Sequence, residues 1–171
     1  MDNITLDRIK TLHPKIRKEI NSLYVKANNR LGKGVRLRFS YTFRTPEEQD
    51  ELFKKKPKVT NARAWQSIHN YGLAFDVVLL YDNDGDSKFE EASWDMRKDG
   101  DKDGLADWLE ITKVFTSNGY TNGFISNNKK WDFPHFQKDF GLSWKQMKEK
   151  IDTGDYKIEN INGKIYKYIN I

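Results

Sequence analysis

The sequence predicts an α+β fold, a single domain in which a small antiparallel sheet is flanked by helices. Segments with apolar residues at every third or fourth position occur between short segments in which every second residue is apolar, so both helices and strands are expected. The chain has 171 residues, which is enough for one hydrophobic core and too short to expect two. Aromatic residues make up 13% of the chain, which is typical of a globular protein rather than a disordered one. We therefore expect residues 1–171 to form one domain.

Four segments have the periodicity of helices. The first contains Pro14, which should divide it into two helices. The second begins with a capping box, Thr45-Pro46-Glu47-Glu48, which puts proline at the first helical position. The four helical segments are residues 5–30, 46–55, 105–118 and 144–151.

Strand signals fall between these helices. An apolar run is interrupted only by Asp76, so we expect a central strand there. Asn162-Gly163 stands between two alternating runs and predicts a β-hairpin within residues 155–171. So short a hairpin is not stable alone and should pack on the rest of the domain. The expected strands are residues 35–41, 74–80, 133–136 and the two arms of the hairpin.

Charge is unevenly distributed along the chain. The net charge is +5, but residues 82–110 carry 11 acidic and 4 basic side chains, so the remaining residues have a surplus of 12 positive charges. A basic body suits an anionic partner such as nucleic acid, a membrane surface or a cell wall. The chain has no cysteine, which excludes disulfides and thiol catalysis. Any metal must therefore be held by His, Asp, Glu or backbone oxygen.

Two of the three histidines lie in segments that suggest a metal centre. His69 precedes Asp76 by seven residues, and His135 follows much later in the chain. Two imidazoles and one carboxylate provide the three protein ligands that a zinc hydrolase needs, with a fourth position left open for water. Asp76 stands in an apolar run, where a bound cation would offset the cost of burying a carboxylate. The same ligand set also fits non-haem iron, and a histidine near an apolar strand is more often structural.

These residues belong to two longer motifs, Ser67-x-His69-x-x-Gly72-x-Ala74-x-Asp76 and Asp132-x-Pro134-His135-Phe136. Together the motifs resemble the signature of the LAS or M15 zinc peptidases. Within that family the chain is most similar to the L-alanyl-D-glutamate peptidases found as phage endolysins and bacterial autolysins. The resemblance covers about residues 35–140, which is most of the chain.

The resemblance implies roles for six residues. It implies that His69, Asp76 and His135 hold a catalytic zinc ion. It implies that Asp132 is the catalytic base, which would take a proton from water and pass it to the leaving amine. It also implies that Arg44 takes part in catalysis by binding the substrate or its developing negative charge, and that Ser67 lies at the substrate cleft.

An acidic segment predicts a second metal site. Its spacing fits the EF-hand loop pattern D-x-D-x-D-G-x5-E, in which the glycine, here Gly104, makes a sharp turn. The expected calcium ligands are Asp99, Asp101, Asp103, the carbonyl of Leu105, Asp107 and Glu110. We expect calcium to be structural or regulatory and to order one wall of the cleft, and the alternative is a solvated acidic turn. Residues 82–86 also alternate acids but lack the glycine and the glutamate of the pattern, which leaves a second calcium site open.

The resemblance implies a zinc-dependent peptidase that cuts the L-Ala–D-Glu bond of peptidoglycan stem peptides. Two alternatives remain: a D-alanyl-D-alanine carboxypeptidase or dipeptidase of the same superfamily, and a non-catalytic, calcium-stabilised cell-wall-binding module. Nucleic acid is not an expected partner, because the sequence has no recognition-helix or stacking motif.

The sequence also supports expectations about localisation. The first residues have no charged region followed by an apolar one, so we expect no secretory signal. No stretch approaches the roughly 20 apolar residues that cross a bilayer, so we expect no membrane span. We expect a monomer that stays in the cytoplasm until a holin-type pore releases it, or that acts at the bacterial cell wall.

Overall fold

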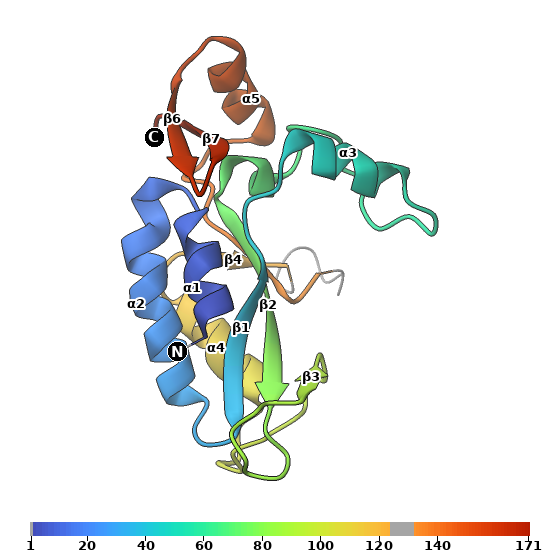
Figure 1. Cartoon of the computed structure of the whole chain (residues 1–171), viewed down its shortest axis with the longest axis vertical. Coiled ribbons are helices and arrows are strands. Elements are labelled where there is room, and N and C mark those ends of the chain that lie inside the picture. The colour runs from blue at the N-terminus through green and yellow to red at the C-terminus, as the bar shows by residue number, and fades with distance from the viewer. Residues whose placement is uncertain (1, 124–131) are drawn as a thin grey trace.

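The computed structural model describes residues 2–123 and 132–171 and has the α+β architecture that the sequence predicts (Figure 1). Its helices are α1 (Asn3–Lys10), α2 (Pro14–Arg30), α3 (Pro46–Lys54), α4 (Asp107–Thr116) and α5 (Trp144–Asp152). Its strands are β1 (Val35–Tyr41), β2 (Ala74–Tyr81), β3 (Glu91–Ser93), β4 (Thr121–Asn122), β5 (His135–Gln137), β6 (Tyr156–Ile161) and β7 (Lys164–Ile169). A 3-10 turn, Ile68–Tyr71, precedes β2.

β2 is the central strand of the main sheet, and its neighbours differ along its length. The strand order is β1-β2-β5-β4, β3 also pairs with β2, and all pairs are antiparallel. β5 pairs with the first three residues of β2, where Asp76 lies opposite His135. β3 pairs with the last three, which end at Tyr81. One end of β2 therefore meets the second histidine motif, and the other end meets the acidic segment.

Stacked aromatic rings hold three strands of this sheet in register. Phe39 of β1, Phe75 of β2 and Phe136 of β5 are fully buried, and their ring centroids are 4.6 and 5.5 Å apart in that order. Phe115 of α4 contacts all three rings. Figure 1 shows α1, α2 and α4 on the same side of the sheet. Each buried ring contributes roughly 1.5–3 kcal/mol to folding, so this layer fixes the strands that carry the site residues.

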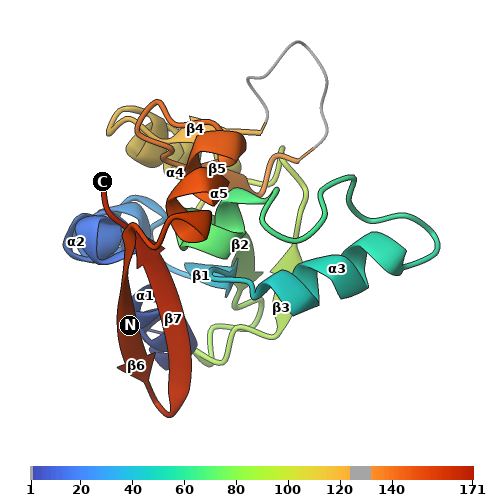
Figure 2. The same ribbon diagram turned by 90° about the horizontal axis from the view of Figure 1, so that it is seen from above.

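The C-terminal hairpin, β6 and β7, packs against the N-terminal helices. The Tyr168 hydroxyl donates to the carbonyl of Thr11 at 3.0 Å. His13 Nε2 and the carbonyl of Ile169 are 2.8 Å apart, and the ring donates because a carbonyl can only accept. Figure 2 shows the hairpin beside α1. The hairpin is therefore tied to the segment between α1 and α2.

Most expected elements form within two residues of their expected bounds. Pro14 separates α1 from α2 by becoming the first residue of α2. The 3-10 turn, β3 and β4 were not expected, because segments of two to four residues carry no periodicity that a sequence reveals. In the part of the chain that the structure describes, no helix is both long enough and apolar enough to cross a membrane.

Candidate active site

A tight turn brings His69 back to the start of β2. His69 lies in the 3-10 turn, which ends at Gly72 with a φ of 68°. A Cβ at position 72 would come within 2.8 Å of the backbone nitrogen of His13, so glycine is needed both for its conformation and for the close approach. β2 then starts at Ala74 and places Asp76 beside His69.

Three donor atoms meet at this point. His69 Nε2 is 3.3 Å from Asp76 Oδ1, His135 Nδ1 is 3.0 Å from the same oxygen, and the two ring nitrogens are 3.2 Å apart. Zinc bonds of 2.0–2.1 Å in a tetrahedral arrangement put ligand atoms about 3.3 Å from one another. The triangle of donor atoms therefore has the dimensions of a zinc site.

The other nitrogen of each ring is occupied. His69 Nδ1 donates to the carbonyl of Thr42 at 2.6 Å, which leaves the lone pair of a neutral ring on Nε2. His135 Nε2 lies 3.0 Å from Gln137 Oε1, and Gln137 donates its own amide N–H toward Asp139, so His135 donates here as well. Both lone pairs and the Asp76 carboxylate then point at one another, an arrangement that favours a shared cation.

The electrostatics of the three ligands agree with this interpretation. Burial alone would raise the pKa of Asp76, but the neighbouring imidazoles outweigh it and hold the pKa well below its usual range. Burial alone would lower the pKa of His135, but the hydrogen bond and charge of Asp76 outweigh it and raise the pKa. The site thus stabilises positive charge between these groups.

The ligands line a cleft of about 390 Å³. Its lining includes all six residues of the expected peptidase site: Arg44, Ser67, His69, Asp76, Asp132 and His135. No lining residue comes from residues 82–110, so the expectation that the acidic loop forms one wall of this cleft is wrong. Asp76 and Tyr81 are five residues apart on an extended strand, a distance of about 17 Å, and the acidic loop lies beyond the Tyr81 end.

Burial is the main influence on Asp132. It raises the pKa of Asp132, the charge of Asp76 adds to the effect, and the two imidazoles and Arg44 oppose it. A carboxylate with a raised pKa is a better proton acceptor than an ordinary aspartate. Asp132 is thus suited to the role of general base.

Arg44 is positioned by residues that sequence reasoning did not assign to the site. Its guanidinium lies 4.6 Å from the centre of the Tyr41 ring, and its Nη1 donates to Gln49 Oε1 at 2.9 Å. Gln49 is fully buried and is itself fixed by a bond to the carbonyl of Ala62. Arg44 Nη2 is 3.9 Å from Asp76 Oδ2. The guanidinium is therefore held beside the candidate metal ligands.

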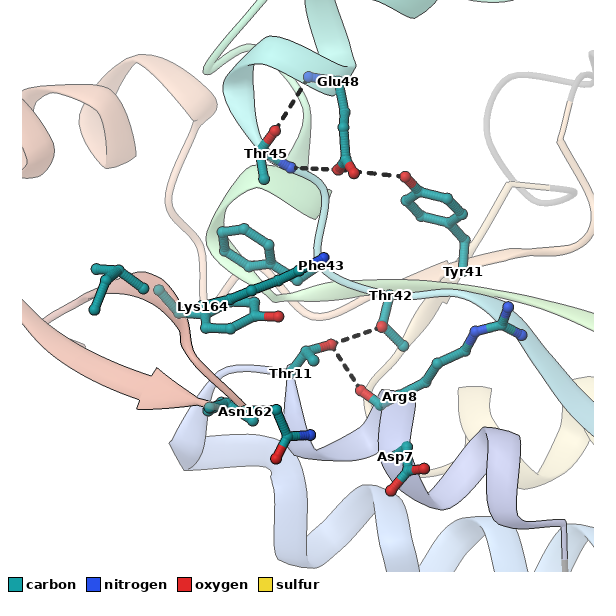
Figure 3. Close-up of a pocket in the computed structure, with 13 residues that line it drawn as sticks. Asp7, Arg8, Thr11, Tyr41, Thr42, Phe43, Thr45, Glu48, Asn162 and Lys164 are labelled. Carbon is teal, nitrogen blue, oxygen red and sulfur yellow. Dashed lines mark hydrogen bonds between the residues drawn. The ribbon is translucent and has the colours of Figure 1, made fainter.

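A second pocket, of about 360 Å³, is lined by Tyr41 and Thr42 and by residues of α1, α3 and the C-terminal hairpin (Figure 3). Figure 3 shows its two hydrogen-bond networks, in which Glu48 joins Thr45 to Tyr41 and Thr11 joins α1 to Thr42. None of the expected site residues lines it. Its connection with the candidate metal ligands is indirect, because the Thr42 carbonyl orients His69.

The acidic loop brings five carboxylates together at the start of α4. Oxygens of Asp99, Asp101 and Asp107 lie within 4.8 Å of one another, as do oxygens of Asp101, Asp103 and Glu110. Gly104 has a φ of 93°, as the sharp turn of the calcium pattern requires. The side chain of Leu105 is exposed, and its amide donates to Asp103.

Two of these carboxylates are buried, and each has one oxygen that accepts no hydrogen bond from the described residues. Asp107 is fully buried, and its Oδ2 accepts bonds from Tyr81 and Gly100, but its Oδ1 has no donor among the described residues. Glu110 is 5% exposed, and its Oε2 likewise has no donor within residues 2–123 and 132–171. Burial, followed by the charges of the neighbouring aspartates, raises the pKa of Glu110 to about 7. Buried carboxylate oxygens without a donor in an acidic cluster have the chemistry of cation ligands.

The second acidic group differs from the first. Oxygens of Asp82, Asp84, Asp86 and Glu90 also lie within 4.8 Å of one another. Its three aspartates accept backbone N–H bonds of their own loop, as Asp99, Asp101 and Asp103 do in the first group. Unlike the first group, it is mostly exposed and includes no buried side-chain oxygen that lacks a donor among the described residues. A second calcium site in this group stays an open prediction.

Comparisons with known proteins agree with the fold and the motifs. No model of a known protein family matches the chain. The peptidoglycan L-alanyl-D-glutamate endopeptidase CwlK of Bacillus subtilis (strain 168) is 36% identical over 131 residues, which are 74% of this chain and 72% of that protein. The crystal structure of the Serratia marcescens L-Ala D-Glu endopeptidase ChiX has a similar fold, with a TM-score of 0.54 and 19% identity over 82% of this chain and 90% of that one. The chain belongs to the LAS or M15 peptidase family, among the relatives of the L-alanyl-D-glutamate peptidases.

Proposed function

We propose that the protein is a zinc-dependent peptidase that hydrolyses the L-Ala–D-Glu bond of peptidoglycan stem peptides. The proposal rests mainly on three donor atoms, one each from His69, Asp76 and His135. They lie 3.0–3.3 Å from one another, which is the spacing of ligand atoms around tetrahedral zinc. The choice of bond rests on CwlK, whose name describes this activity.

Each residue has a chemical role in this proposal. A zinc ion held by the three ligands would lower the pKa of water toward 7 and polarise the scissile carbonyl. Asp132 accepts the proton of the attacking water and passes it to the leaving amine. Arg44 offers a fixed guanidinium to a substrate carboxylate, such as that of D-glutamate. Ser67 lines the same cleft and would contact the peptide.

The proposal is tested by digesting purified peptidoglycan with the zinc-loaded protein and identifying the released ends by mass spectrometry. We expect new N-terminal D-Glu ends. The matched control is Asp132→Asn, which keeps the size of the side chain and should still bind zinc, but should cleave about 100-fold or more slowly because it cannot accept a proton.

Three other outcomes would contradict the proposal. Release of free D-Ala without new D-Glu ends would indicate a carboxypeptidase of the same superfamily. Equal cleavage rates for Asp132→Asn and the unmodified protein would show that Asp132 is not the general base. Binding to walls without cleavage at any zinc concentration would favour the non-catalytic module.

We also propose that the acidic loop binds one calcium ion through Asp99, Asp101, Asp103, Asp107, Glu110 and the carbonyl of Leu105. Support comes from the buried, unsatisfied oxygens of Asp107 and Glu110. Isothermal titration should find one site that prefers calcium to magnesium, because the loop offers many oxygens in a flexible arrangement. Glu110→Gln should weaken binding at least tenfold, by our estimate, since it removes a bidentate ligand.

Glu90→Gln is the matched control for calcium binding, because it changes the second acidic group alone. It should leave the affinity unchanged. Equal affinities for Glu110→Gln and the unmodified protein would contradict the assignment of the loop, and a second bound ion that Glu90→Gln removes would place another site at residues 82–90.

A further inference from the structure

The second pocket and the cleft share a wall, which is formed by residues 41–45. Four of these five residues line the second pocket, and the fifth, Arg44, lines the cleft. The ring of Tyr41, which belongs to the second pocket, has its centroid 6.1 Å from that of the His69 ring. The second pocket therefore begins one aromatic ring away from a proposed zinc ligand.

Three segments that are far apart in the sequence form the second pocket (Figure 3). They are α1, residues 41–48 and the turn of the C-terminal hairpin, residues 161–166. The hairpin is held in place because the Tyr168 hydroxyl donates to the carbonyl of Thr11. With a volume of about 360 Å³, the pocket lies in the size range of sites that bind small ligands.

The charged side chains that line the second pocket balance one another. The two negative ones are Asp7 and Glu48, and the two positive ones are Arg8 and Lys164. The remaining polar groups of its side chains are hydroxyls and the amide of Asn162. A lining without net charge suits a neutral ligand rich in hydroxyl groups better than it suits an anionic polymer.

Two polar side chains of the hairpin are available to such a ligand. Tyr166 is 9% exposed, and its hydroxyl has no hydrogen-bond partner among the described residues. The side-chain amide of Asn162 likewise makes no hydrogen bond within residues 2–123 and 132–171. The hydroxyl of a largely buried tyrosine usually has a partner. A ligand in the pocket would supply one.

Aromatic rings provide the apolar part of the second pocket. The rings of Phe43 and Tyr166 meet edge to face, with centroids 4.9 Å apart, and Tyr41 adds a third ring to the lining. The C–H groups of a pyranose sugar pack on aromatic rings, while its hydroxyl and acetamido groups bond to side chains such as those of Tyr166 and Asn162. The pocket therefore has the chemistry of a carbohydrate site.

The proposed substrate has a carbohydrate close to the bond that is cut. In peptidoglycan the stem peptide begins with L-Ala, which is joined by an amide bond to the lactyl group of N-acetylmuramic acid. Only one residue, roughly 3.5 Å of extended chain, separates the L-Ala–D-Glu bond from that group. A stem peptide bound beside His69 would thus bring its sugar near the wall that the cleft shares with the second pocket.

We propose that the second pocket is a subsite for the N-acetylated sugars of the glycan strand that carries the stem peptide. The inference rests on the proposed function, because that function places L-Ala beside the metal centre. The subsite favours stem peptides that are still attached to glycan over free ones. Since the sugar takes no part in bond cleavage, binding it should lower KM and leave kcat nearly unchanged.

The test compares two soluble substrates of the zinc-loaded protein. In one, the stem peptide is linked to the disaccharide of N-acetylglucosamine and N-acetylmuramic acid, and in the other an acetyl group replaces the disaccharide. We expect KM to be about tenfold lower for the first substrate, which corresponds to one or two additional hydrogen bonds, with similar kcat.

Tyr166→Phe removes a single hydroxyl and should raise KM for the disaccharide substrate about 3- to 10-fold, the effect of one neutral hydrogen bond. It should leave KM for the acetylated peptide unchanged. Asn162→Gly is a second variant with the same expected result, and it keeps the turn because glycine readily adopts the φ of 52° found at this position.

Tyr156→Phe is the matched control, because Tyr156 lies in the same hairpin but does not line the second pocket. It should not change KM for either substrate. A readout independent of cleavage is calorimetric titration with the disaccharide linked to L-Ala amide, a neutral probe that has no L-Ala–D-Glu bond. Tyr166→Phe should weaken its binding, and Tyr156→Phe should not.

The outcomes separate failure of this inference from failure of the proposed function. Equal KM values for the two substrates overturn the inference and leave the peptidase intact. An equal rise in both KM values in Tyr166→Phe shows that the hydroxyl supports the fold, and also overturns it. So does a disaccharide advantage that disappears between about 0.05 and 0.3 M salt, because screening acts on an anionic ligand and not on a neutral sugar. Cleavage of neither substrate overturns the proposed function, and the titration then decides by itself whether the pocket binds the sugar.

Discussion

At the scale of single residues, the proposed zinc ligands depend on the groups that hydrogen-bond to them. Gln137 accepts the Nε2 proton of His135, so it keeps the lone pair of the ring on the side of Asp76. Removing such a partner typically lowers metal affinity about 10- to 100-fold. Gln137→Leu should therefore weaken zinc binding by about this factor, measured by competition with a chelating dye.

A stronger acceptor at position 137 should have the opposite effect on zinc affinity. Gln137→Glu places a charged acceptor on His135 Nε2, which makes the ring a stronger ligand, so zinc affinity should rise. Gln66→Leu is the control, because Gln66 lines the same cleft without touching a ligand and instead accepts the amide of Arg63. A loss of zinc affinity in Gln66→Leu equal to that in Gln137→Leu would show that the effect is not specific to His135.

Arg44 offers a second prediction at this scale. Its guanidinium is fixed by Tyr41 and Gln49, so two of its N–H groups can meet one carboxylate. Arg44→Lys keeps the charge but loses this geometry, and kcat/KM should fall roughly 10- to 100-fold, an estimate that assumes one lost charge-assisted pair. The loss should be largest for a peptide whose D-Glu carboxylate is free.

The measurement compares that peptide with one in which the same carboxylate is an amide. The unmodified protein should prefer the free acid, and Arg44→Lys should not distinguish between the two. If both proteins discriminate equally, Arg44 does not contact the carboxylate.

At the scale of elements, the third histidine links two segments that are distant in sequence. His13 caps α2 by accepting the amide of Lys15 on Nδ1, and its Nε2 donates to Ile169 in β7. Burial lowers the pKa of His13, aided by Arg17 and Lys15 and opposed by the bond to Ile169. The folded protein therefore favours the neutral ring.

This lowered pKa predicts a loss of stability in weak acid. Because the folded pKa of His13 lies below its unfolded value of 6.5, the stabilisation is complete above pH 6.5 and is lost as pH falls through the folded pKa. Thermal unfolding of the zinc-saturated protein should show this between pH 7.5 and 5.5. His13→Asn keeps a good capping side chain without a titrating group, so its melting temperature should change less over that range. An identical pH dependence in both proteins would contradict the prediction.

The elements also show which features a sequence can predict. The bounds of α2, β1 and α3 follow from proline, alternation and a capping box, which are local signals. β3 and β4 have two or three residues and exist because β2 and β5 are there to pair with them. The wrong expectation about the position of the acidic loop has a related cause. Its ligand pattern is local, but its distance from the cleft is set by the length of β2 and by the strand to which it connects.

The residues of the candidate site divide in the same way, into those with a local sequence signal and those placed only by the folded chain. His69, Asp76, His135 and Asp132 stand in motifs with fixed spacing, so the sequence identified them. Their supports were missed, because Thr42 acts through a backbone carbonyl and Gln49 through a buried contact made only in the folded chain. Gln137 alone had a local signal, since it follows His135 by two positions on a strand, which puts both side chains on the same face.

At the scale of the whole molecule, the negatively charged segment and the candidate active site belong to different parts of the chain. Residues 82–110 hold a surplus of 7 negative charges, and the rest of the chain has 12 more positive charges than negative ones. The cleft is lined from the basic part alone. A negatively charged wall would therefore attract the part of the chain that holds the site and repel the acidic loop.

This separation predicts that salt weakens action on intact walls more than action on small substrates. Attraction between a basic surface and an anionic polymer is screened over about 10 Å at 0.1 M ionic strength, whereas binding of a short peptide inside the cleft depends on contacts much closer than that. Raising ionic strength from about 0.05 to 0.3 M should lower the rate on intact walls several-fold and change kcat/KM for a soluble stem peptide by less than about twofold. Walls stripped of their anionic polymers are the control and should behave like the peptide. Equal salt sensitivity on all three substrates would mean that the basic surface does not guide the protein to the wall, and that its charge serves solubility alone.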